Sequence, residues 1–393
     1  IDPALSPDGL VLYFASNRPP ESVDRPPVAE SGSPSAEGDD QELKAQTDFD
    51  HYAADLAGDT PFELLVERQL SMLYSLREGA LADPEVMGKL GGSAQTEAAI
   101  DKGLAFLAQT QEPDGRWNIA RHGGQGGHDV AATAFSLLAF YGRGERHDRD
   151  CRYRDNVQRG LEWLLSQQDG ASGDLRGKRP GHNAMYDHGI ASLALVEAYG
   201  VTKDPELRPR AHAAIEFIAE SQHAQGGWRY RPGDKGDLSV TGWMVMSLAS
   251  AQMSGIPVNE KTLAGVAGFL QHVRGGQHGG SYGYTDSPGK RHSGRPGMNA
   301  AGFFSAQLTG SSFNSPMAYE SAALLTKAGF KYDDLYYAYY GTFAAYQHQG
   351  PVWRAWMAKM QSEFLKAQTK DGSWTPRGNH GNAMGRVVGT ALV

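Results

Sequence analysis

One pattern recurs along the chain and limits its fold more than any other feature. Each copy is an amphipathic segment that ends in Gln, followed by a Gly-containing turn and then an aromatic residue. The best copies span residues 103–117, 160–168 and 214–228, and weaker copies span 269–282 and 364–374. Self-similarity at a fixed period is typical of repeat architectures, in which each unit is one supersecondary element. The pattern predicts a series of similar helical hairpins.

Segments of a second type, rich in Ala, Thr and Gly, alternate with the first. They contain Thr133-Ala134, Ala191-Ser192, Thr241-Gly242, Ala300-Ala301, Thr342-Phe343 and Thr390-Ala391. Their larger amphipathic predecessors start near residues 96, 155, 208, 260, 316 and 353. Small residues let helices crowd around an axis, so we predict an all-α fold, an (α/α)6 toroid of six helical hairpins with the small-residue helices inside. The last inner helix reaches Val393, and we expect the ring to lack a turn or two of that element.

Composition divides the chain into four regions. Residues 1–18 hold the turn signal Ser6-Pro7-Asp8-Gly9 before an alternating apolar stretch, which predicts a short β-hairpin-like fragment. Residues 19–46 are rich in Pro, Ser and acidic residues and predict a disordered linker. Residues 47–92 predict a helical lead-in with an amphipathic helix over 61–83, and residues 93–393 form the toroid.

Charge and cysteine content exclude several classes of function. A net charge of −8 argues against nucleic acid as a partner, because neutralising phosphates needs a basic face. Cys151 is the single cysteine, so the chain forms neither an internal disulfide nor a thiolate zinc cluster. The chain starts at Ile1 without an initiator Met or a signal peptide, so we expect a fragment whose targeting signal and compartment are not readable.

The Gln, Gly and Trp signature resembles the QW repeat of squalene–hopene and oxidosqualene cyclases. The resemblance covers about three quarters of the chain and implies a squalene cyclase-like toroid, with a central cavity that binds an isoprenoid or another apolar ligand. Protein prenyltransferase β-subunits share this toroid but hold zinc with Asp, Cys and His, and Cys151 falls on the opposite face. Residues 1–18 resemble a TolB-like propeller repeat.

The resemblance also indicates where an acid would stand. In class II terpene cyclases an Asp-x-Asp-Asp-Thr-Ala motif begins an inner helix, and its middle Asp protonates the substrate. The corresponding stretch here runs from Asp237 to Gly242 and carries Ser239 at the acid position. Asp129 and Asp187 stand at the same offset before two other inner helices.

Two interpretations of these three aspartates stay open. They are helix N-caps, whose carboxylates accept backbone hydrogen bonds. Alternatively Asp129, Asp187 and Asp237 converge at one rim with His188, and one of them acts as a general acid. A zinc site of His128, Asp129, His182 and His188 is chemically conceivable, but no tight pair spacing supports it, so we expect no metal and no cofactor.

Candidate ligand-binding residues lie in two places. The links from outer to inner helices, here called the mouth loops, are rich in Gly, Arg and His. The inner helices add aromatic rings, which line a cavity or fill a core. The candidates are His122, His128, His182, Arg231, Arg295 and His380 from the loops, and Tyr186, Trp243, Tyr336, Tyr337 and Tyr340 from the helices.

Three functions therefore remain: an isoprenoid-binding toroid, a polysaccharide lyase or glycosidase on the same toroid, and a non-catalytic interaction module. The corresponding partner is a small apolar or carbohydrate ligand, and peripheral contact with a membrane is compatible with the first function. An apolar aromatic pocket favours the first, an open polar cleft the second, and a filled ring the third.

Overall fold

The computed structural model describes residues 2–5, 12–15, 92–178, 180–286, 295–312, 314–378 and 381–393. The chain divides into two compact units, residues 1–73 and 74–393. In the first, β1 (Asp2–Leu5) and β2 (Leu12–Ala15) form an antiparallel hairpin in which Pro3 pairs with Phe14. The expected hairpin is therefore present. The predicted linker and the amphipathic helix over 61–83 lie outside the described residues.

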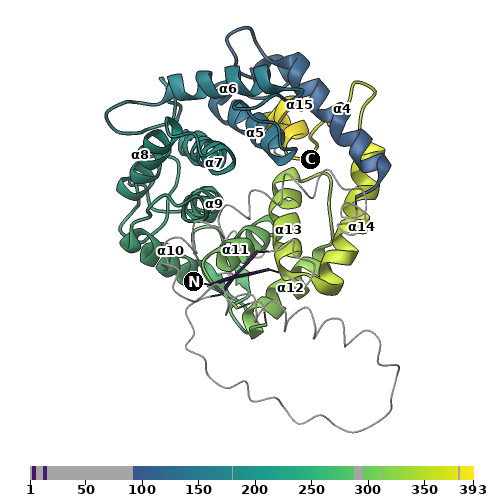
Figure 1. The fold of residues 1–393 in the computed structure, drawn as a ribbon. Coiled ribbons are helices and arrows are strands. Elements are labelled where there is room, and N and C mark those ends of the chain that lie inside the picture. The colour runs from purple at the N-terminus through teal and green to yellow at the C-terminus, as the bar shows by residue number, and fades with distance from the viewer. Residues whose placement is uncertain are drawn as a thin grey trace, which may run out of the picture. The chain divides into compact units, whose positions relative to one another are not determined.

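The second unit is a ring of alternating outer and inner helices (Figure 1). The outer helices are α4 (Ala94–Thr110), α6 (Arg154–Gln167), α8 (Leu207–Glu220), α10 (Glu260–Val273), α12 (Pro316–Ala328) and α14 (Gly350–Ala367). The inner helices are α5 (Asp129–Gly142), α7 (Met185–Thr202), α9 (Leu238–Ser254), α11 (Pro296–Leu308), α13 (Leu335–His348) and α15 (Gly381–Ala391). Three minor elements lie in the links: η1 (Ala120–His122), β3 (Arg274–Gly275) and β4 (Ser281–Tyr282). The prediction of an all-α toroid of six hairpins is confirmed.

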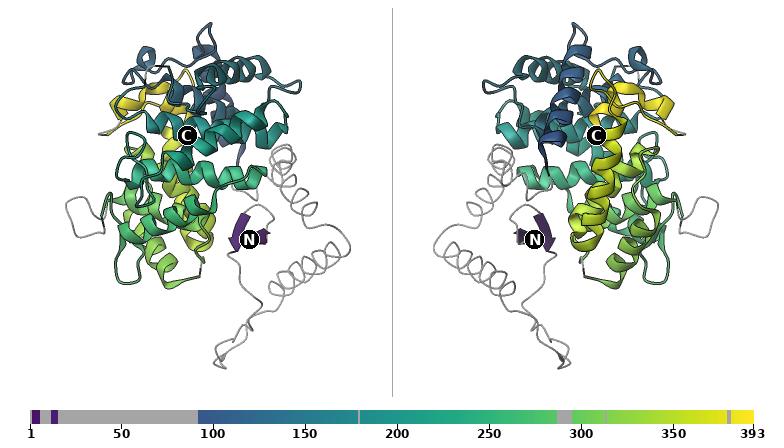
Figure 2. Two further views of the ribbon diagram at one scale, coloured as in Figure 1. Left: turned by 90° about the vertical axis from the view of Figure 1, so that its left-hand side faces the viewer. Right: turned by 90° about the vertical axis from the view of Figure 1, so that its right-hand side faces the viewer.

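Burial separates the two kinds of helix. Nearly every residue of α7 and α9 is buried, because each of these two helices packs on an inner helix at both sides and on an outer helix behind. The outer helices bury one face and expose the other, as their apolar periodicity predicted. The view down the ring shows the inner helices enclosed by the outer ones (Figure 1), and Figure 2 shows the same ring from two sides. Within the described residues, no helix is long and apolar enough to cross a membrane.

Among the described residues, the repeated Gln joins α4 to α6, α6 to α8, α8 to α10 and α14 to α4. Gln111 Nε2 donates to the carbonyl of Gly115 in its own turn, at 2.8 Å, and to the carbonyl of Asn156 in α6, at 2.9 Å. Gln222 makes the same two contacts with Gly226 and with Thr262 of α10. The side-chain amide thus ties neighbouring hairpins through their backbones.

One of these contacts closes the ring. Gln368, at the end of α14, donates to the carbonyl of Ala99 in α4 at 2.7 Å, although the two residues are far apart in the sequence. Its second bond, at 2.9 Å, goes to Gly372 in its own turn, as in the other copies. The repeat contact therefore also forms the seam between the last outer helix and the first.

Each inner helix except α13 carries a polar side chain that accepts the backbone N–H of the residue after the Gly turn, within the described part of the chain. We call this side chain the anchor. The anchors and their donors are Thr133 with Trp117, His188 with Leu175, Thr241 with Trp228, Asn299 with Tyr282 and Thr390 with Trp374. The anchors give the inner helices a common register, which allows the helices to be compared residue by residue.

This register aligns α15, which lies at the end of the given sequence, with α5 and α9. Helix α5 continues from Thr133 to Gly142, and α9 continues from Thr241 to Ser254. Helix α15 ends at Ala391, next to its anchor Thr390. It packs on α5 and α4, whereas its contact with α13 is marginal at most.

Candidate functional site

Asp237 is the N-cap of α9 and is fully buried. Its Oδ1 accepts the backbone N–H of Val240 at 2.9 Å and the hydroxyl of Ser239 at 2.8 Å. Its Oδ2 accepts the Tyr284 hydroxyl at 2.9 Å, and Arg229 Nε lies 3.5 Å away. Burial raises the pKa of this carboxyl above its ordinary value. For Asp237 the capping interpretation is correct.

Asp187 and Asp129 are not N-caps, because α7 starts at Met185 and α5 at Asp129 itself. Asp187 bridges to the neighbouring helix: Oδ1 accepts the N–H of Ala131 at 3.0 Å, and Oδ2 lies 2.6 Å from His128 Nδ1. Asp129 Oδ1 accepts the N–H of Ile119 at 3.0 Å. The N-cap expectation is wrong for these two, since both helices begin earlier than the sequence pattern suggested. Their carboxylates hold neighbouring segments together.

His128 is the one histidine among the candidates that pairs with a buried carboxylate in the described residues. Its side chain is 20% exposed, while that of Asp187 is 1% exposed. The hydrogen bond to Asp187 raises the pKa of His128 above its usual value of 6.5. The pair links the start of α5 to the start of α7.

Ser239, which stands at the acid position, belongs to a series of hydrogen bonds that links three tyrosine hydroxyls through Asp237. Ser239 Oγ donates to Asp237, so it accepts from the Tyr186 hydroxyl 2.5 Å away. On the other side, Tyr284 donates to Asp237 and accepts from the Tyr230 hydroxyl at 2.8 Å. Each polar group in this series is bonded to another, so the cluster holds the rim together.

The other predicted polar residues take separate positions. His188 is an anchor: its Nδ1 accepts from Leu175, and burial lowers its pKa to about 4, so it is neutral. His182 packs its ring on Tyr230, with centroids 5.4 Å apart, and His122 places its ring near Phe106. Arg231 and Arg295 are exposed, and His380 lies outside the described residues. Among the described residues, no group of three or more His, Cys, Asp or Glu side chains is arranged to hold a metal ion.

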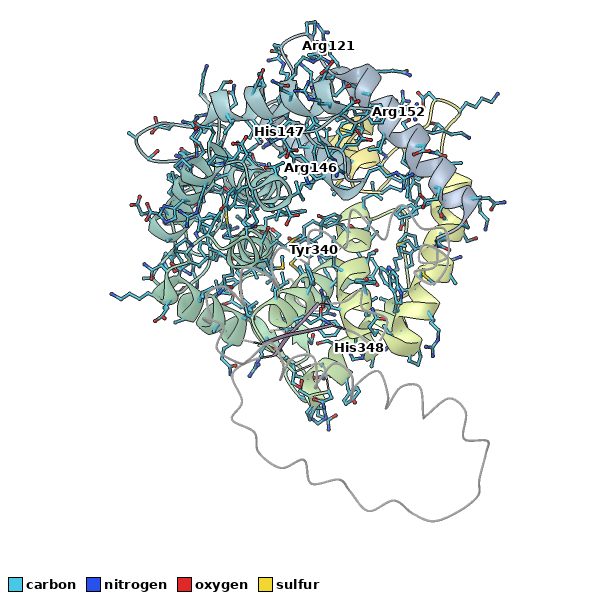
Figure 3. All side chains as sticks on the ribbon, viewed as in Figure 1. Arg121, Arg146, His147, Arg152, Tyr340 and His348 are labelled. Atoms are coloured by element: carbon cyan, nitrogen blue, oxygen red, sulfur yellow. The ribbon has the colours of Figure 1, made fainter. Side chains whose placement is uncertain are left out.

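Aromatic side chains meet across the interior of the ring. Trp243 of α9 contacts Phe135 of α5 and Tyr340 of α13, with centroids 5.2 Å apart in both pairs. Tyr340, which lies toward the middle of the ring in Figure 3, also contacts Tyr336 at 4.9 Å. We call these four rings the aromatic cluster. It fills the space between helices that are not neighbours around the ring.

The run of four tyrosines in α13 divides between two directions. Tyr337 points outward: it packs on Trp356 of α14, and its hydroxyl donates to the carbonyl of Gly329 at 2.9 Å. Tyr336, Tyr339 and Tyr340 point inward, and Tyr339 lies 5.4 Å from Trp243. Tyr337 therefore joins α13 to the outer layer and lies away from the interior.

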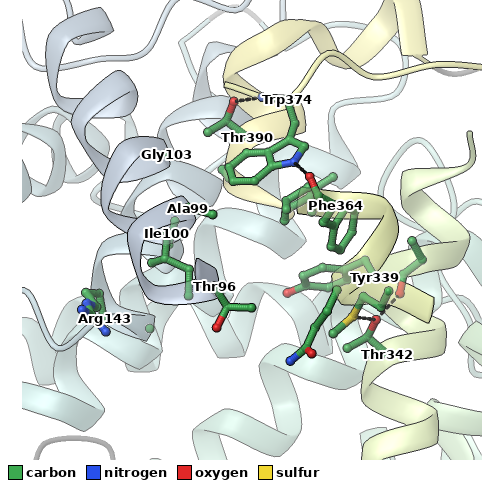
Figure 4. Close-up of a pocket in the computed structure, with 18 of the residues that line it drawn as sticks. Thr96, Ala99, Ile100, Gly103, Arg143, Tyr339, Thr342, Phe364, Trp374 and Thr390 are labelled. Atoms are coloured by element: carbon green, nitrogen blue, oxygen red, sulfur yellow. Dashed lines mark hydrogen bonds between the residues drawn. The ribbon is translucent and has the colours of Figure 1, made fainter. Parts of the chain in front are cut away.

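A cavity of about 520 Å³ opens beside the aromatic cluster (Figure 4). It lies between α4, α5, α13 and α14, and the end of α15 borders it. Its lining is largely apolar and includes Phe135, Leu138, Tyr339, Phe343, Trp353 and Phe364. At its edge Arg143 pairs with Glu97 at 2.5 Å and with Asp101 at 3.3 Å. We call this cavity the apolar pocket.

No family model matches the chain. Squalene–hopene cyclase from Bradyrhizobium diazoefficiens is 27% identical over 170 residues, which are 38% of this chain and 24% of that enzyme. A variant of the type II terpene cyclase MstE from Scytonema, solved with geranylgeranyl dihydroxybenzoate, superposes with a TM-score of 0.50 at 13% identity, covering 76% of this chain and 95% of that one. The fold is a squalene cyclase-like α/α toroid.

Two other solved toroids show how widely this architecture is used. An inactive variant of the α-1,6-mannanase GH76A of Salegentibacter, in complex with α-1,6-mannotriose, has a TM-score of 0.53 at 12% identity and covers 75% of this chain and 97% of that one. Cellobiose 2-epimerase from Bacillus thermoamylovorans also has a TM-score of 0.53 at 12% identity, covering 73% and 93%. These likenesses concern the fold alone.

The sequence of this squalene cyclase-like toroid did not indicate the apolar pocket, which lies between inner and outer helices. None of the candidate ligand-binding residues lines it. Sequence reasoning looked for a cavity on the axis and at the mouth loops. The walls of the pocket come from four separate helices, so no single motif in the sequence indicates it.

Proposed function

We propose that this squalene cyclase-like toroid binds an apolar ligand of isoprenoid type in the apolar pocket. The observation that carries the proposal is the lining: aromatic and aliphatic side chains from four helices surround a cavity of about 520 Å³, and its charged groups stand at the edge. Transferring hydrocarbon surface from water into such a lining gains roughly 25 cal/mol per Å². Rings such as Phe135 and Tyr339 also suit the flat π-bonds of an isoprenoid chain.

We propose binding without proton-initiated cyclisation. A serine hydroxyl is too weak an acid to protonate an alkene, and Ser239 already donates its proton to Asp237. The Asp237 carboxylate is in turn occupied by Ser239, Tyr284 and a backbone N–H. Both features support a ligand-binding role for the ring and argue against the reaction that the resemblance would otherwise imply.

The lining favours an apolar ligand over a carbohydrate. A sugar needs several convergent hydrogen-bonding groups. The polar groups at the rim bond to one another, as Tyr230, Tyr284 and Asp237 do. The apolar pocket offers few such groups, and the resemblance in fold to the mannanase says nothing about its ligand.

Squalene and geranylgeraniol are suitable first probes, with binding followed by quenching of tryptophan fluorescence, since Trp353 and Trp374 line the pocket. Ala139→Phe places a ring into the pocket from α5 and should weaken binding at least 10-fold. Ala264→Phe, on the exposed face of α10, is the matched control and should bind normally. Equal affinity of both variants, or no binding of either probe to the parent protein, would overturn the proposal.

A further inference from the structure

We propose that a second cavity, between the mouth loops that precede α5 and α15, binds a small phosphate ester with a polar body. The cavity measures about 370 Å³, and its lining includes Arg121, His122, Thr375, Pro376, Asn382 and Arg386. We call it the polar pocket. It shares no lining residue with the apolar pocket, so this inference goes beyond the proposed function and does not depend on it.

The walls of the polar pocket are held in place by backbone contacts between the loop before α5 and the start of α15. The N–H of Gln125 donates to the carbonyl of Ala383 at 3.0 Å. Gly385 has a φ of 62°, and a Cβ there would lie 2.5 Å from the backbone nitrogen of Gly124, so the two segments are in close contact. A site whose walls are already in place loses less conformational entropy when a ligand binds.

Two guanidinium groups give the polar pocket its positive charge. Arg121, labelled in Figure 3, donates to Glu112 through Nη1 alone, so its Nε and Nη2 have no hydrogen-bond acceptor among the described residues. Arg386 uses Nε and Nη2 to bind Ser373 and Asp371, and its Nη1 has no acceptor in the same part of the chain. Neither carboxylate lines the polar pocket, so each arginine keeps N–H groups for a ligand.

The buried ring of Phe106 in α4 packs against two of the lining side chains. Arg386 Cζ lies 5.0 Å from the centroid of this ring, and the centroid of the His122 ring lies 6.1 Å from it. Burial lowers the pKa of His122, and the charge of Arg386 lowers it further. Arg121 acts in the same direction and Glu112 against it. His122 is therefore a neutral hydrogen-bonding group near pH 7, placed beside two positive charges.

These groups favour a phosphate ester over other anions. One guanidinium group can satisfy both oxygens of a carboxylate. A phosphate monoester has three terminal oxygens and a charge of about −1.5 to −2 near pH 7, so it can bind Arg121, Arg386 and His122 together. The polar pocket is also several times larger than the roughly 30 Å³ that one water occupies in the liquid. Thr375 and Asn382 add uncharged polar groups to the lining, which suit the hydroxyl groups of a polar body.

Isothermal titration calorimetry with glucose 6-phosphate and glycerol 3-phosphate tests the ligand class on the parent protein. Glucose tests the need for the phosphate, inorganic phosphate the need for the polar body, and glucuronate whether a carboxylate is enough. We expect the esters to bind, glucose not to bind, and the other two anions to bind at least about 10-fold more weakly. Failure of both esters to bind, or equal affinity for inorganic phosphate or glucuronate, would overturn the inference.

Two variants of exposed lining residues test the position of the site. Arg121→Gln removes a charged donor, and Asn382→Asp keeps the side-chain shape but adds a negative charge. Each should weaken binding of glucose 6-phosphate at least about 10-fold while the protein stays folded, which thermal unfolding checks.

The matched control is Arg154→Gln, which removes another exposed arginine that pairs with a carboxylate, Asp155, and lies outside the polar pocket. It should bind glucose 6-phosphate within about twofold of the parent protein. Unchanged affinity in both lining variants would overturn the assignment of the polar pocket. Geranylgeraniol should bind Arg121→Gln and the parent protein equally, so this inference and the proposed function can fail separately.

Discussion

At the residue scale, the glycine turns show how tightly the hairpins are packed. Gly226 has a φ of 86°, and a Cβ at this position would overlap the carbonyl oxygen of Gly265 in α10. Gly115 and Gly372 are in the same situation against Arg159 and Lys102. The positive φ favours Gly, and the close approach of the next outer helix requires it. The turn glycines therefore set the distance between neighbouring hairpins.

This packing gives a prediction with an internal control. Gly233 also has a positive φ, 74°, but nothing lies within 4 Å of a Cβ there. Gly233→Ala should cost about 1 kcal/mol of unfolding free energy, the usual penalty for a left-handed alanine. Gly226→Ala adds a clash with backbone and should cost at least about 3 kcal/mol. Urea unfolding of both variants measures the difference, and equal losses would show that only conformational strain matters.

The His128–Asp187 pair predicts a dependence of stability on pH. Asp187 raises the pKa of His128 in the folded chain, so the folded state binds the proton more tightly than the unfolded state. The stabilisation is complete below the unfolded pKa of about 6.5 and is lost as pH rises through the higher folded pKa.

The wild-type protein should therefore lose unfolding free energy relative to His128→Asn as pH rises from about 6 through the raised pKa. Chemical denaturation across this range tests the difference, in which the titrating groups that do not contact His128 cancel, while Asp187 is coupled to it. Asp187→Asn provides the second arm: an NMR titration should show the pKa of His128 falling toward 6.5. An unchanged pKa of His128 in Asp187→Asn would rule out this coupling.

At the element scale, the side-chain amides of the repeat make an outer helix depend on the next one at four junctions of the described ring. Gln368, at the end of α14, donates a hydrogen bond from Nε2 to the carbonyl of Ala99 in α4. Replacing it leaves two backbone carbonyls without that donor, at a cost of about 1–3 kcal/mol.

Gln368→Ala should therefore speed amide hydrogen exchange in α4 and α14 while leaving α8 and α10 unchanged. Gln222→Ala is the matched control, since Gln222 joins its turn to Thr262 of α10. Its effect should be confined to α8 and α10. A uniform increase of exchange around the ring in both variants would mean that the hairpins unfold as one unit.

At the scale of the whole molecule, the ring was predictable because its repeat encodes contacts that are local in each copy. A Gln at the end of an outer helix and a Trp after a Gly turn recur in the sequence at the positions where the structure uses them. The roles of Asp129 and Asp187 were less accessible, because they depend on where each inner helix begins to within a few residues. The apolar pocket was least accessible, since it depends on four helices at once.

The alternation of inner and outer helices has one further consequence. Because every inner helix is followed by an outer helix that returns, the inner helices run parallel and their macrodipoles add at the rim. Asp129, Asp187 and Asp237 place negative charge at the positive ends of α5, α7 and α9, where each such interaction is worth about 0.3–1 kcal/mol. Three carboxylates at one rim therefore offset the electrostatic cost of crowding parallel helices into a ring.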